Sequence, residues 1–315
     1  MKTALIGFGD ISEKHISVLN ELNCKIDGVL VQNPTAYVEK SKKFGIDKFY
    51  TSLDEIKNSD CDFIMIMASA ENNCQLLKSV MSFKKPIFIE KPVGFSSQEI
   101  DQVIQINQKF QLPIMVGMNR RYYSIFHSAI NYLKLNNKKI NSIFVEAPER
   151  FSDINKAKFS DNVKKHWMFS NSIHCIDLIR FFSGDIKEIT SYSDPSKFVF
   201  NAVGVSEQNI PFVYSSNWLS PGKWSITIYA DDVRIVFNPL ENGKIITKNH
   251  IQEIIPSEDD IKFKPGFYSQ LKYFLENVIE KHQLVWPCSD LIDHKKSLET
   301  IEKIFPTTLD IPFKK

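Results

Sequence analysis

Short apolar runs alternate with amphipathic stretches through the first third of the chain. The runs TALIGF, KIDGVLV, DFIMIMA, KPIFIE and LPIMVGM have the length and composition of buried strands. The stretches between them have helical spacing, and Ser52 with Glu55 fits the capping-box pattern of a helix start. The same pattern recurs at Ser96 with Glu99. Alternating helices and wholly apolar strands predict a parallel sheet covered on both faces.

The pattern changes after Met118. We expect a helix over 122–135, a strand in INSIFVEAPER, a lysine-rich loop, and a helix in NSIHCIDLIRFFSG that ends at Gly184. Most segments over 186–242 read as strands separated by turns, and two helices, near 266–280 and 289–304, close the chain. The chain is therefore predicted to be an α/β protein: a doubly wound parallel sheet over 1–118, then an α+β domain over 119–315 with an open, mainly antiparallel sheet.

Composition excludes several classes of protein. The 315 residues are 43% apolar and 24% charged, with a net charge of +2, and no basic stripe of the kind that binds nucleic acid. No apolar run approaches the roughly 18 residues that cross a membrane, and the N-terminus lacks the features of a signal peptide. The five cysteines are widely spaced without a CxxC pair, which favours a reduced, cytoplasmic protein. Residues 166–177 offer no zinc-type spacing, so no metal is expected.

The first chemical motif is GFGDIS at the end of the first strand. Gly7 permits a tight turn, and Gly9 lets the backbone approach a pyrophosphate. The helix that follows offers its N-terminal amide groups and the positive end of its dipole. Ser12 stands where a third glycine or alanine is usual and is small enough for that place. We therefore expect a dinucleotide to bind at Gly7, Phe8, Gly9, Asp10 and Ile11.

The end of the second strand decides between NAD and NADP in many dinucleotide-binding proteins. An acidic residue there holds the ribose hydroxyls of NAD, and an arginine accommodates the 2′-phosphate of NADP. Here the strand ends in Gln32 and Asn33, which can hydrogen-bond either form of the ribose. Both cofactors stay open, and the missing carboxylate repulsion slightly favours NADP.

The second chemical motif is FIEKP, in which an apolar strand ends in Glu90 and Lys91. Ligands of open α/β sheets bind at the carboxyl ends of the strands, so this lysine is placed for chemistry. Its charge would stabilise a developing alkoxide or polarise a carbonyl group. Pro92 can hold a cis peptide and fix the direction of the preceding side chain. A solvated lysine at a strand end is the alternative.

Five segments together carry a resemblance to a known family. They are IGFGDISEKH, EKP, VGMNRRY, HCIDLIRFFSG and FKPGFYSQLKYFLENV, and they occur in the expected order over most of the chain. In these segments the chain resembles the Gfo/Idh/MocA oxidoreductases, named for glucose-fructose oxidoreductase and inositol dehydrogenase. The resemblance implies a Rossmann domain, an α+β domain, and hydride transfer between NAD or NADP and a sugar or polyol. It also implies a homodimer or homotetramer formed through the open sheet.

The resemblance also assigns roles to residues. Lys91 takes the place of the family's catalytic lysine and His174 that of its histidine, whose ordinary pKa suits proton transfer. The cofactor would also contact six positions near strand ends: Met67, Ala68, Ser69, Glu90, Lys91 and Asn119. The substrate would contact a further set, in addition to Lys91 and His174: Arg121, Tyr122, Trp167, Ser170, Asn171 and Asp177.

The chain departs from the family pattern around His174. The family has aspartate four residues before this histidine, where the chain has Ser170, and Asn171 could serve in its stead by orienting His174 or binding substrate. The glycine-rich run usual before it is also absent. Cations at 164–166 stand there instead, which would suit a phosphorylated or carboxylated substrate such as a nucleotide sugar. Two further hypotheses stay open: a dinucleotide-binding sensor or regulator without catalysis, and a reductase of a non-sugar carbonyl or imine.

Overall fold

The computed structural model describes residues 1–309 and divides the chain into two compact units. The first unit consists of residues 1–119 and 259–295, and the second of residues 120–258 and 296–315. The helix α12 (Leu291–Ile304) begins in the first unit and ends in the second. These two units, each made of two segments, differ from a single domain boundary between residues 118 and 119. That boundary stays a prediction.

The first unit is built on a parallel six-stranded sheet with the strand order β3-β2-β1-β4-β5-β6. Its strands are β1 (Lys2–Ile6), β2 (Lys25–Leu30), β3 (Phe49–Tyr50), β4 (Phe63–Ile66), β5 (Ile87–Glu90) and β6 (Ile114–Gly117). The strands β4, β5 and β6 are buried at every position, as their apolar runs predict. The strand order reverses between β1 and β4, and this switch point is where doubly wound sheets bind ligands.

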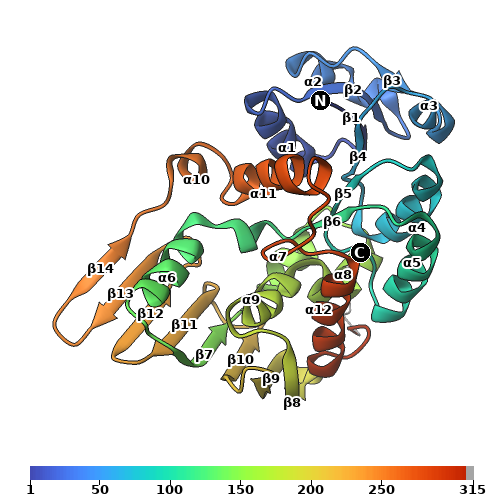
Figure 1. Cartoon of the computed structure of the whole chain (residues 1–315). Helices are drawn as coiled ribbons and strands as arrows, with labels where there is room; N and C mark the ends of the chain where they lie inside the picture. Colours follow the sequence, from blue (N-terminus) through green and yellow to red (C-terminus); the bar gives the residue numbers. More distant parts are fainter. Residues whose placement is uncertain (310–315) are drawn as a thin grey trace. The chain divides into compact units, whose positions relative to one another are not determined.

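Helices cover both faces of this sheet (Figure 1), with α1 and α11 on one side and α4 and α5 on the other. The helical segments of the unit are α1 (Asp10–Glu21), η1 (Pro34–Tyr37), α2 (Val38–Lys43), α3 (Leu53–Lys57), α4 (Ala70–Val80), η2 (Met81–Phe83), α5 (Ser97–Phe110), α11 (Phe267–Tyr273) and η6 (Phe274–Ile279). Both predicted capping residues are confirmed: Ser52 Oγ accepts from the Glu55 amide at 3.3 Å, and Ser96 Oγ accepts from the Glu99 amide at 3.2 Å.

A segment from late in the sequence completes the first unit. The ring of Phe267 in α11 lies 4.6 Å from the ring of His15 in α1, measured between centroids. Lys262, at the end of α10 (Glu258–Lys262), forms a 2.7 Å ion pair with Glu21. Residues 259–295 therefore stabilise the helix that follows the glycine turn.

The second unit is built on an eight-stranded, mostly antiparallel sheet with the order β14-β13-β12-β11-β7-β10-β9-β8. The strands are β7 (Ile140–Glu146), β8 (Ile186–Asp194), β9 (Val199–Ser206), β10 (Pro211–Asn217), β11 (Ser225–Ala230), β12 (Val233–Phe237), β13 (Gly243–Thr247) and β14 (Ile251–Ile254). Only β7 and β10 pair in parallel. The α/β class with a separate, mainly antiparallel sheet is thus confirmed, while β13 and β14 extend the sheet beyond the predicted limit at residue 242.

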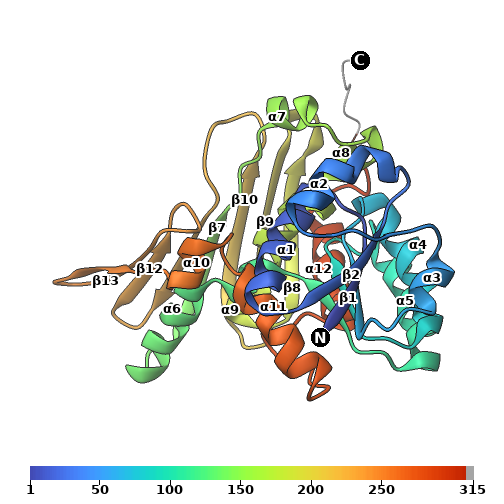
Figure 2. The same cartoon turned by 90° about the horizontal axis from the view of Figure 1, so that it is seen from above.

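One face of this sheet carries the core of the second unit. A buried row crosses the strands in register from Ile143 through Ile228 and Ile235 to Ile245. The helix α6 (Ser124–Leu135) packs on β13 and β14 and α9 (Ile173–Ser183) on β7, on one side of the sheet in Figure 2. The remaining helical segments that contribute to this unit are η3 (Asn119–Tyr122), α7 (Phe151–Lys156), α8 (Asp161–Lys165), η4 (Met168–Ser172) and η5 (Pro195–Lys197).

No helix within residues 1–309 is both long and apolar enough to cross a membrane. All five cysteines lie within the described residues, are buried, and form no disulfide. Among the same residues, no group of three or more His, Cys, Asp and Glu side chains is arranged to hold a metal ion.

Candidate cofactor and substrate sites

The predicted cofactor residues gather at the carboxyl edge of the parallel sheet. Gly7 and Gly9 follow β1, Met67 to Ser69 follow β4, and Lys91 follows β5. Asn119 comes shortly after β6, is buried, and donates from Nδ2 to the Pro265 carbonyl at 3.0 Å. Because β1 and β4 flank the switch point, these segments line the place where a doubly wound sheet holds a nucleotide.

The glycine turn after β1 has two different requirements. Gly7 has φ of +96°, and a Cβ atom there would lie 2.5 Å from the Met67 carbonyl oxygen, so only glycine allows β1 to turn against the end of β4. A Cβ on Gly9 would meet nothing within 4 Å, so that side of the turn faces open space.

Gly9 is also the N-cap of α1 and makes no side-chain cap. The first amides of this 12-residue helix, at Asp10 and Ile11, are therefore available for an anion. The open space and the helix N-terminus together fit the pyrophosphate of a dinucleotide.

Lys40 in α2 is a residue at this turn that sequence reasoning missed. Its Nζ donates to the carbonyl oxygens of Phe8 at 2.9 Å and Gly9 at 3.0 Å, and it lies 4.9 Å from the centroid of the Phe8 ring. It also pairs with Glu13 at 3.0 Å, and this hydrogen bond lowers the pKa of Glu13. Lys40 therefore connects α2 to the glycine turn and places a positive charge beside it. No local sequence motif predicts this contact.

The residues after β2 do not decide between the ribose of NAD and the phosphorylated ribose of NADP. Gln32 and Asn33 are exposed beyond β2, and Asn33 Oδ1 accepts a 2.6 Å hydrogen bond from Thr35 Oγ1. Both side chains can reach a hydroxyl or a phosphate oxygen, so their chemistry fits NAD and NADP alike.

Asn73 in α4 holds the segment that carries Lys91. Its Nδ2 donates to the Glu90 carbonyl at 3.0 Å and to the Pro92 carbonyl at 2.9 Å. The two bonds flank Lys91, and the peptide between Lys91 and Pro92 is cis, as the motif predicted. Asn73 is 1% exposed and was not predicted, because it meets this segment only in the fold. Lys91 itself is half-buried at the sheet edge.

Glu90 forms a buried pair with His15, whose Nε2 lies 2.6 Å from Glu90 Oε1. Burial raises the pKa of Glu90, but the hydrogen bond and charge of His15 and the charge of Lys91 outweigh it and hold the pKa below its usual value. The pair therefore stabilises the fold above the ordinary carboxyl pKa and loses that contribution as the pH falls through the lowered value.

In the second unit, His174 is buried near the start of α9 beside an aromatic and cationic group. Its ring centroid lies 6.3 Å from that of Trp224, and the guanidinium of Arg120 lies 4.8 Å from the Trp224 ring. The Trp224 indole donates to the Pro148 carbonyl at 3.0 Å, which fixes the ring. Trp224 is a third residue, after Lys40 and Asn73, that the sequence did not single out.

Arg121 and Asp177, both predicted to contact substrate, bind each other instead. Arg121 Nε donates to Asp177 Oδ2 at 2.7 Å and Nη2 to Oδ1 at 2.6 Å, and the side chains are 3% and 2% exposed. Ser297 also donates to Asp177 Oδ1 at 2.8 Å. Tyr122 is buried as well. This geometry gives Arg121 and Asp177 a structural role, and a substrate role for these residues stays a prediction.

The predicted residues before His174 lie in a π-helical turn. Ser170 is buried in η4, while Asn171 is half-buried and donates to Glu149. Trp167, the residue before this turn, is also half-buried. Such π-helical turns are rare and occur frequently at functional sites.

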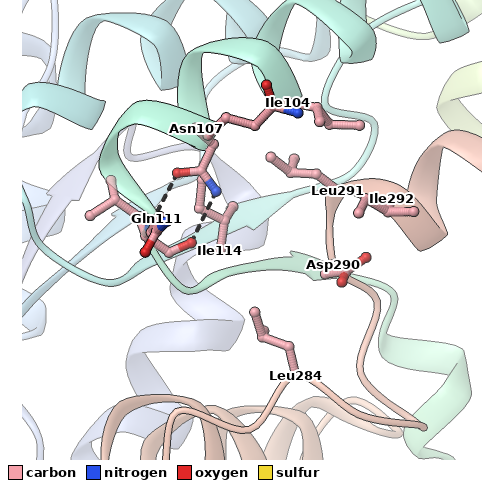
Figure 3. Close-up of a pocket in the computed structure, with 10 residues that line it drawn as sticks. Ile104, Asn107, Gln111, Ile114, Leu284, Asp290, Leu291 and Ile292 are labelled. Atoms are coloured by element: carbon pink, nitrogen blue, oxygen red, sulfur yellow. Dashed lines mark hydrogen bonds between the residues drawn. The ribbon is translucent and has the colours of Figure 1, made fainter.

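A cavity of about 320 Å³ lies elsewhere in the first unit (Figure 3). Ile104, Leu291 and Leu284 are among its lining residues, and Asn107 binds the backbone of Leu112 beside it. Ile114, another lining residue, begins β6, so the cavity is at the amino edge of the sheet, opposite the edge described above. Its lining is apolar apart from Asn107, Gln108, Gln111 and Asp290, and includes no cationic side chain for a nucleotide phosphate.

Fold and edge residues together define a dinucleotide-binding protein of the doubly wound class. The profile of the oxidoreductase family Gfo/Idh/MocA, described as an NAD-binding Rossmann fold, matches residues 1–118. The match covers the first unit's N-terminal 118 residues and supports the resemblance to the Gfo/Idh/MocA oxidoreductases that the motifs carry.

Similar proteins agree with this resemblance. Myo-inositol 2-dehydrogenase of Thermotoga maritima is 25% identical over 127 residues, which span 39% of this chain and 37% of that enzyme. A Gfo/Idh/MocA oxidoreductase structure from Vibrio cholerae matches 96% of both chains with a TM-score of 0.78 and 18% identity. UDP-N-acetylglucosamine 3-dehydrogenase of Acidithiobacillus ferrooxidans also matches 96% of both chains, with a TM-score of 0.76 and 16% identity. At these identities the structural matches establish the fold alone.

Proposed function

We propose that the protein is an NAD(P)-dependent oxidoreductase that acts on a hydroxyl or carbonyl group of a sugar or sugar derivative. The observation that carries this proposal is Lys91 at the carboxyl end of β5, held on both sides by Asn73, on the same sheet edge as the open glycine turn. A bound nicotinamide would supply or accept the hydride. The inositol and UDP-N-acetylglucosamine dehydrogenases among the similar proteins support a polyol or sugar substrate.

In the proposed reaction, Lys91 would stabilise charge and His174 would transfer a proton. The ammonium group of Lys91 would stabilise the negative charge that develops on the substrate oxygen. His174 would take the hydroxyl proton in oxidation and return it in reduction. Its burial beside Trp224 limits the water that competes for that proton.

Replacing Asn73 with Ala should impair catalysis more than cofactor binding. The change removes two hydrogen bonds that flank Lys91, so the lysine loses its fixed position. A displacement of about 1 Å can lower kcat on the order of 100-fold, and two buried hydrogen bonds contribute about 2 kcal/mol to stability. Steady-state kinetics and nicotinamide fluorescence measure the two effects. Gln75→Ala, an exposed change on the same helix, is the control, and unchanged kcat in Asn73→Ala would refute the positioning role.

For the cofactor we propose NADP ahead of NAD. The end of β2 has no carboxylate to repel a 2′-phosphate, and Lys40 and Lys43 of α2 add positive charge near the turn. The substrate is less constrained. Of the cations expected to favour an anionic substrate, Lys164 is buried and donates to the Asn155 carbonyl at 3.0 Å, so a nucleotide sugar has less support than a neutral polyol or sugar.

A substrate panel tests the proposed function. Single-turnover formation or loss of NAD(P)H is followed with myo-inositol, D-glucose, UDP-N-acetylglucosamine, a non-sugar ketone and a cyclic imine. Transfer with a polyol or sugar supports the proposal, and transfer only with the ketone or imine favours a different reductase. If the protein binds cofactor but transfers no hydride with any of the five compounds, the alternative of a non-catalytic regulator is favoured, which the replacement of the family's aspartate by Ser170 motivates.

We also propose that copies of the chain associate through the open face of the eight-stranded sheet. Val203, Val213 and Phe144 lie side by side in register on this face and are 44%, 37% and 38% exposed. An apolar row across adjacent strands is typical of a protein–protein interface. The five buried cysteines, none of which forms a disulfide among the described residues, fit a reducing, cytoplasmic location for the assembly.

Val213→Lys should shift the assembly towards monomers. A lysine in the centre of the apolar row cannot be buried against a second copy without losing its hydration. Light scattering after size-exclusion chromatography measures the mass. Val38→Lys, at a similarly exposed valine in the first unit, is the control. A wild-type monomer, or an unchanged oligomer in Val213→Lys, would contradict the interface.

A further inference from the structure

Glu149, in the loop after β7, is a buried carboxylate with an unusual set of partners. Asn171 Nδ2 donates to both of its oxygens, at 3.1 Å to Oε1 and 3.0 Å to Oε2, and Ser172 Oγ donates to Oε1 at 3.0 Å. The residue is 6% exposed. Burying a carboxylate is costly unless hydrogen bonds compensate for the lost water, and these three bonds come from the turn that leads into α9.

The carboxylate fixes which way the Asn171 amide faces. A carboxylate accepts hydrogen bonds only, so the NH₂ group of Asn171 must face Glu149. Its carbonyl oxygen then faces away from Glu149. Asn171 is half-buried, so this oxygen is presented at an accessible place, three residues before His174.

The surroundings of Glu149 act on its pKa in both directions. Burial is the larger effect and holds the pKa above its usual value, while the hydrogen bonds from Asn171 and Ser172 and the charge of Arg120 favour the ionised form. The guanidinium of Arg120 also lies over Trp224, beside His174. Glu149 and Asn171 therefore belong to the same group of side chains as His174, all within the second unit.

We propose that Glu149 is a positioning residue that supplies the carboxylate absent at Ser170, and that it sets Asn171 to accept a hydrogen bond from a substrate hydroxyl. Asn171 is then a specificity-determining residue, which selects a donor group such as the hydroxyl of a polyol or sugar. This inference rests on the proposed function, because it names the substrate group that the second unit recognises.

Exchanging the carboxylate of Glu149 and the amide of Asn171 tests the proposal. Glu149→Gln introduces a donor that lets the Asn171 amide turn over, so KM should rise about tenfold or more with a smaller change in kcat, as one hydrogen bond to substrate is lost. Asn171→Asp sets two carboxylates against each other and should also raise KM. In the double variant E149Q/N171D, the new amide at position 149 donates to one oxygen of the new carboxylate at position 171. The other oxygen of that carboxylate can then accept the hydrogen bond from the substrate hydroxyl, as the Asn171 carbonyl does in the wild type. The KM should therefore return to within about tenfold of the wild type, because contacting sites are coupled.

Two further variants separate positioning from stability. Glu146→Gln is the matched control, because Glu146 is an exposed glutamate at the end of β7, three residues before Glu149. Asn171→Ala removes the acceptor at a half-buried position, so it remains informative if the Glu149 variants do not fold, and its KM should rise as in Glu149→Gln. If Tm falls in the single variants and recovers in the double variant while KM never changes, the role is structural and the proposal is wrong.

The panel described above supplies the probe, which is whichever of myo-inositol, D-glucose or UDP-N-acetylglucosamine the wild type converts with the highest kcat/KM. A wild type that converts none of the three overturns the proposed function, and the inference with it. A wild type that converts one, with KM unchanged in Glu149→Gln and Asn171→Ala, overturns the inference alone.

Discussion

Lys91→Ala is expected to lower kcat by about three orders of magnitude while leaving the Kd for the nicotinamide cofactor nearly unchanged. Removing one group that stabilises an oxyanion costs roughly 100- to 1,000-fold in kcat. The cofactor should still bind, because its pyrophosphate would rest on the glycine turn and the N-terminus of α1. Stopped-flow kinetics and fluorescence titration measure the two quantities separately.

Lys109→Ala is the control for this experiment, since Lys109 is exposed in the last turn of α5. It removes one positive charge from the same unit without touching the sheet edge. Full turnover by Lys91→Ala would contradict the role assigned to the lysine. Loss of cofactor binding together with turnover would show that Lys91 binds the nucleotide instead.

Asp177→Ala is expected to destabilise the second unit by about 3–5 kcal/mol, the usual cost of removing one partner from a buried ion pair. Asp177 accepts two hydrogen bonds from Arg121 and one from Ser297, and Arg180 lies 3.7 Å away. Without the carboxylate, the buried guanidinium of Arg121 loses its counter-charge, while Arg180 keeps its 2.6 Å pair with Asp185. Urea denaturation followed by tryptophan fluorescence measures the loss, since three of the four tryptophans, Trp167, Trp218 and Trp224, lie in the second unit.

The control is Asp153→Ala, whose side chain is 64% exposed and forms a 4.0 Å ion pair with Arg150 and a 3.4 Å hydrogen bond from Ser152 Oγ. It should change stability by less than about 1 kcal/mol, as for exposed ion pairs. A similarly small loss in Asp177→Ala, combined with a large rise in KM, would instead support the substrate role that the sequence predicted for Asp177.

The parts of the structure that depend on local sequence were predictable. The capping boxes at Ser52 and Ser96 begin helices because the interacting groups are three residues apart. The buried strands β4 and β5 follow from uninterrupted apolar runs, and the glycine turn follows from its place between a strand and a helix. Strands β13 and β14 were missed because β14 is short and mostly exposed, so its sequence carries little apolar pattern.

The parts that depend on distant contacts were not predictable. Asn73 meets Glu90 and Pro92 only after α4 packs beside β5, and Lys40 meets Phe8 only after α2 folds back on the turn. Glu149 and Asn171 are 22 residues apart and carry no motif. A sequence can place a residue at the end of a strand, but which side chain it meets there is decided by the whole fold.

The central claim is that the glycine turn binds a nicotinamide dinucleotide for use by Lys91, and titration of the purified protein with NADH and NADPH tests it most directly. The account predicts saturable enhancement of nicotinamide fluorescence with at least one of the two, with tighter binding of NADPH. Enhancement with NADH alone would overturn the cofactor preference and leave the rest standing. Binding of neither would mean that the turn after β1 is only structural, and the proposed oxidoreductase function would be contradicted.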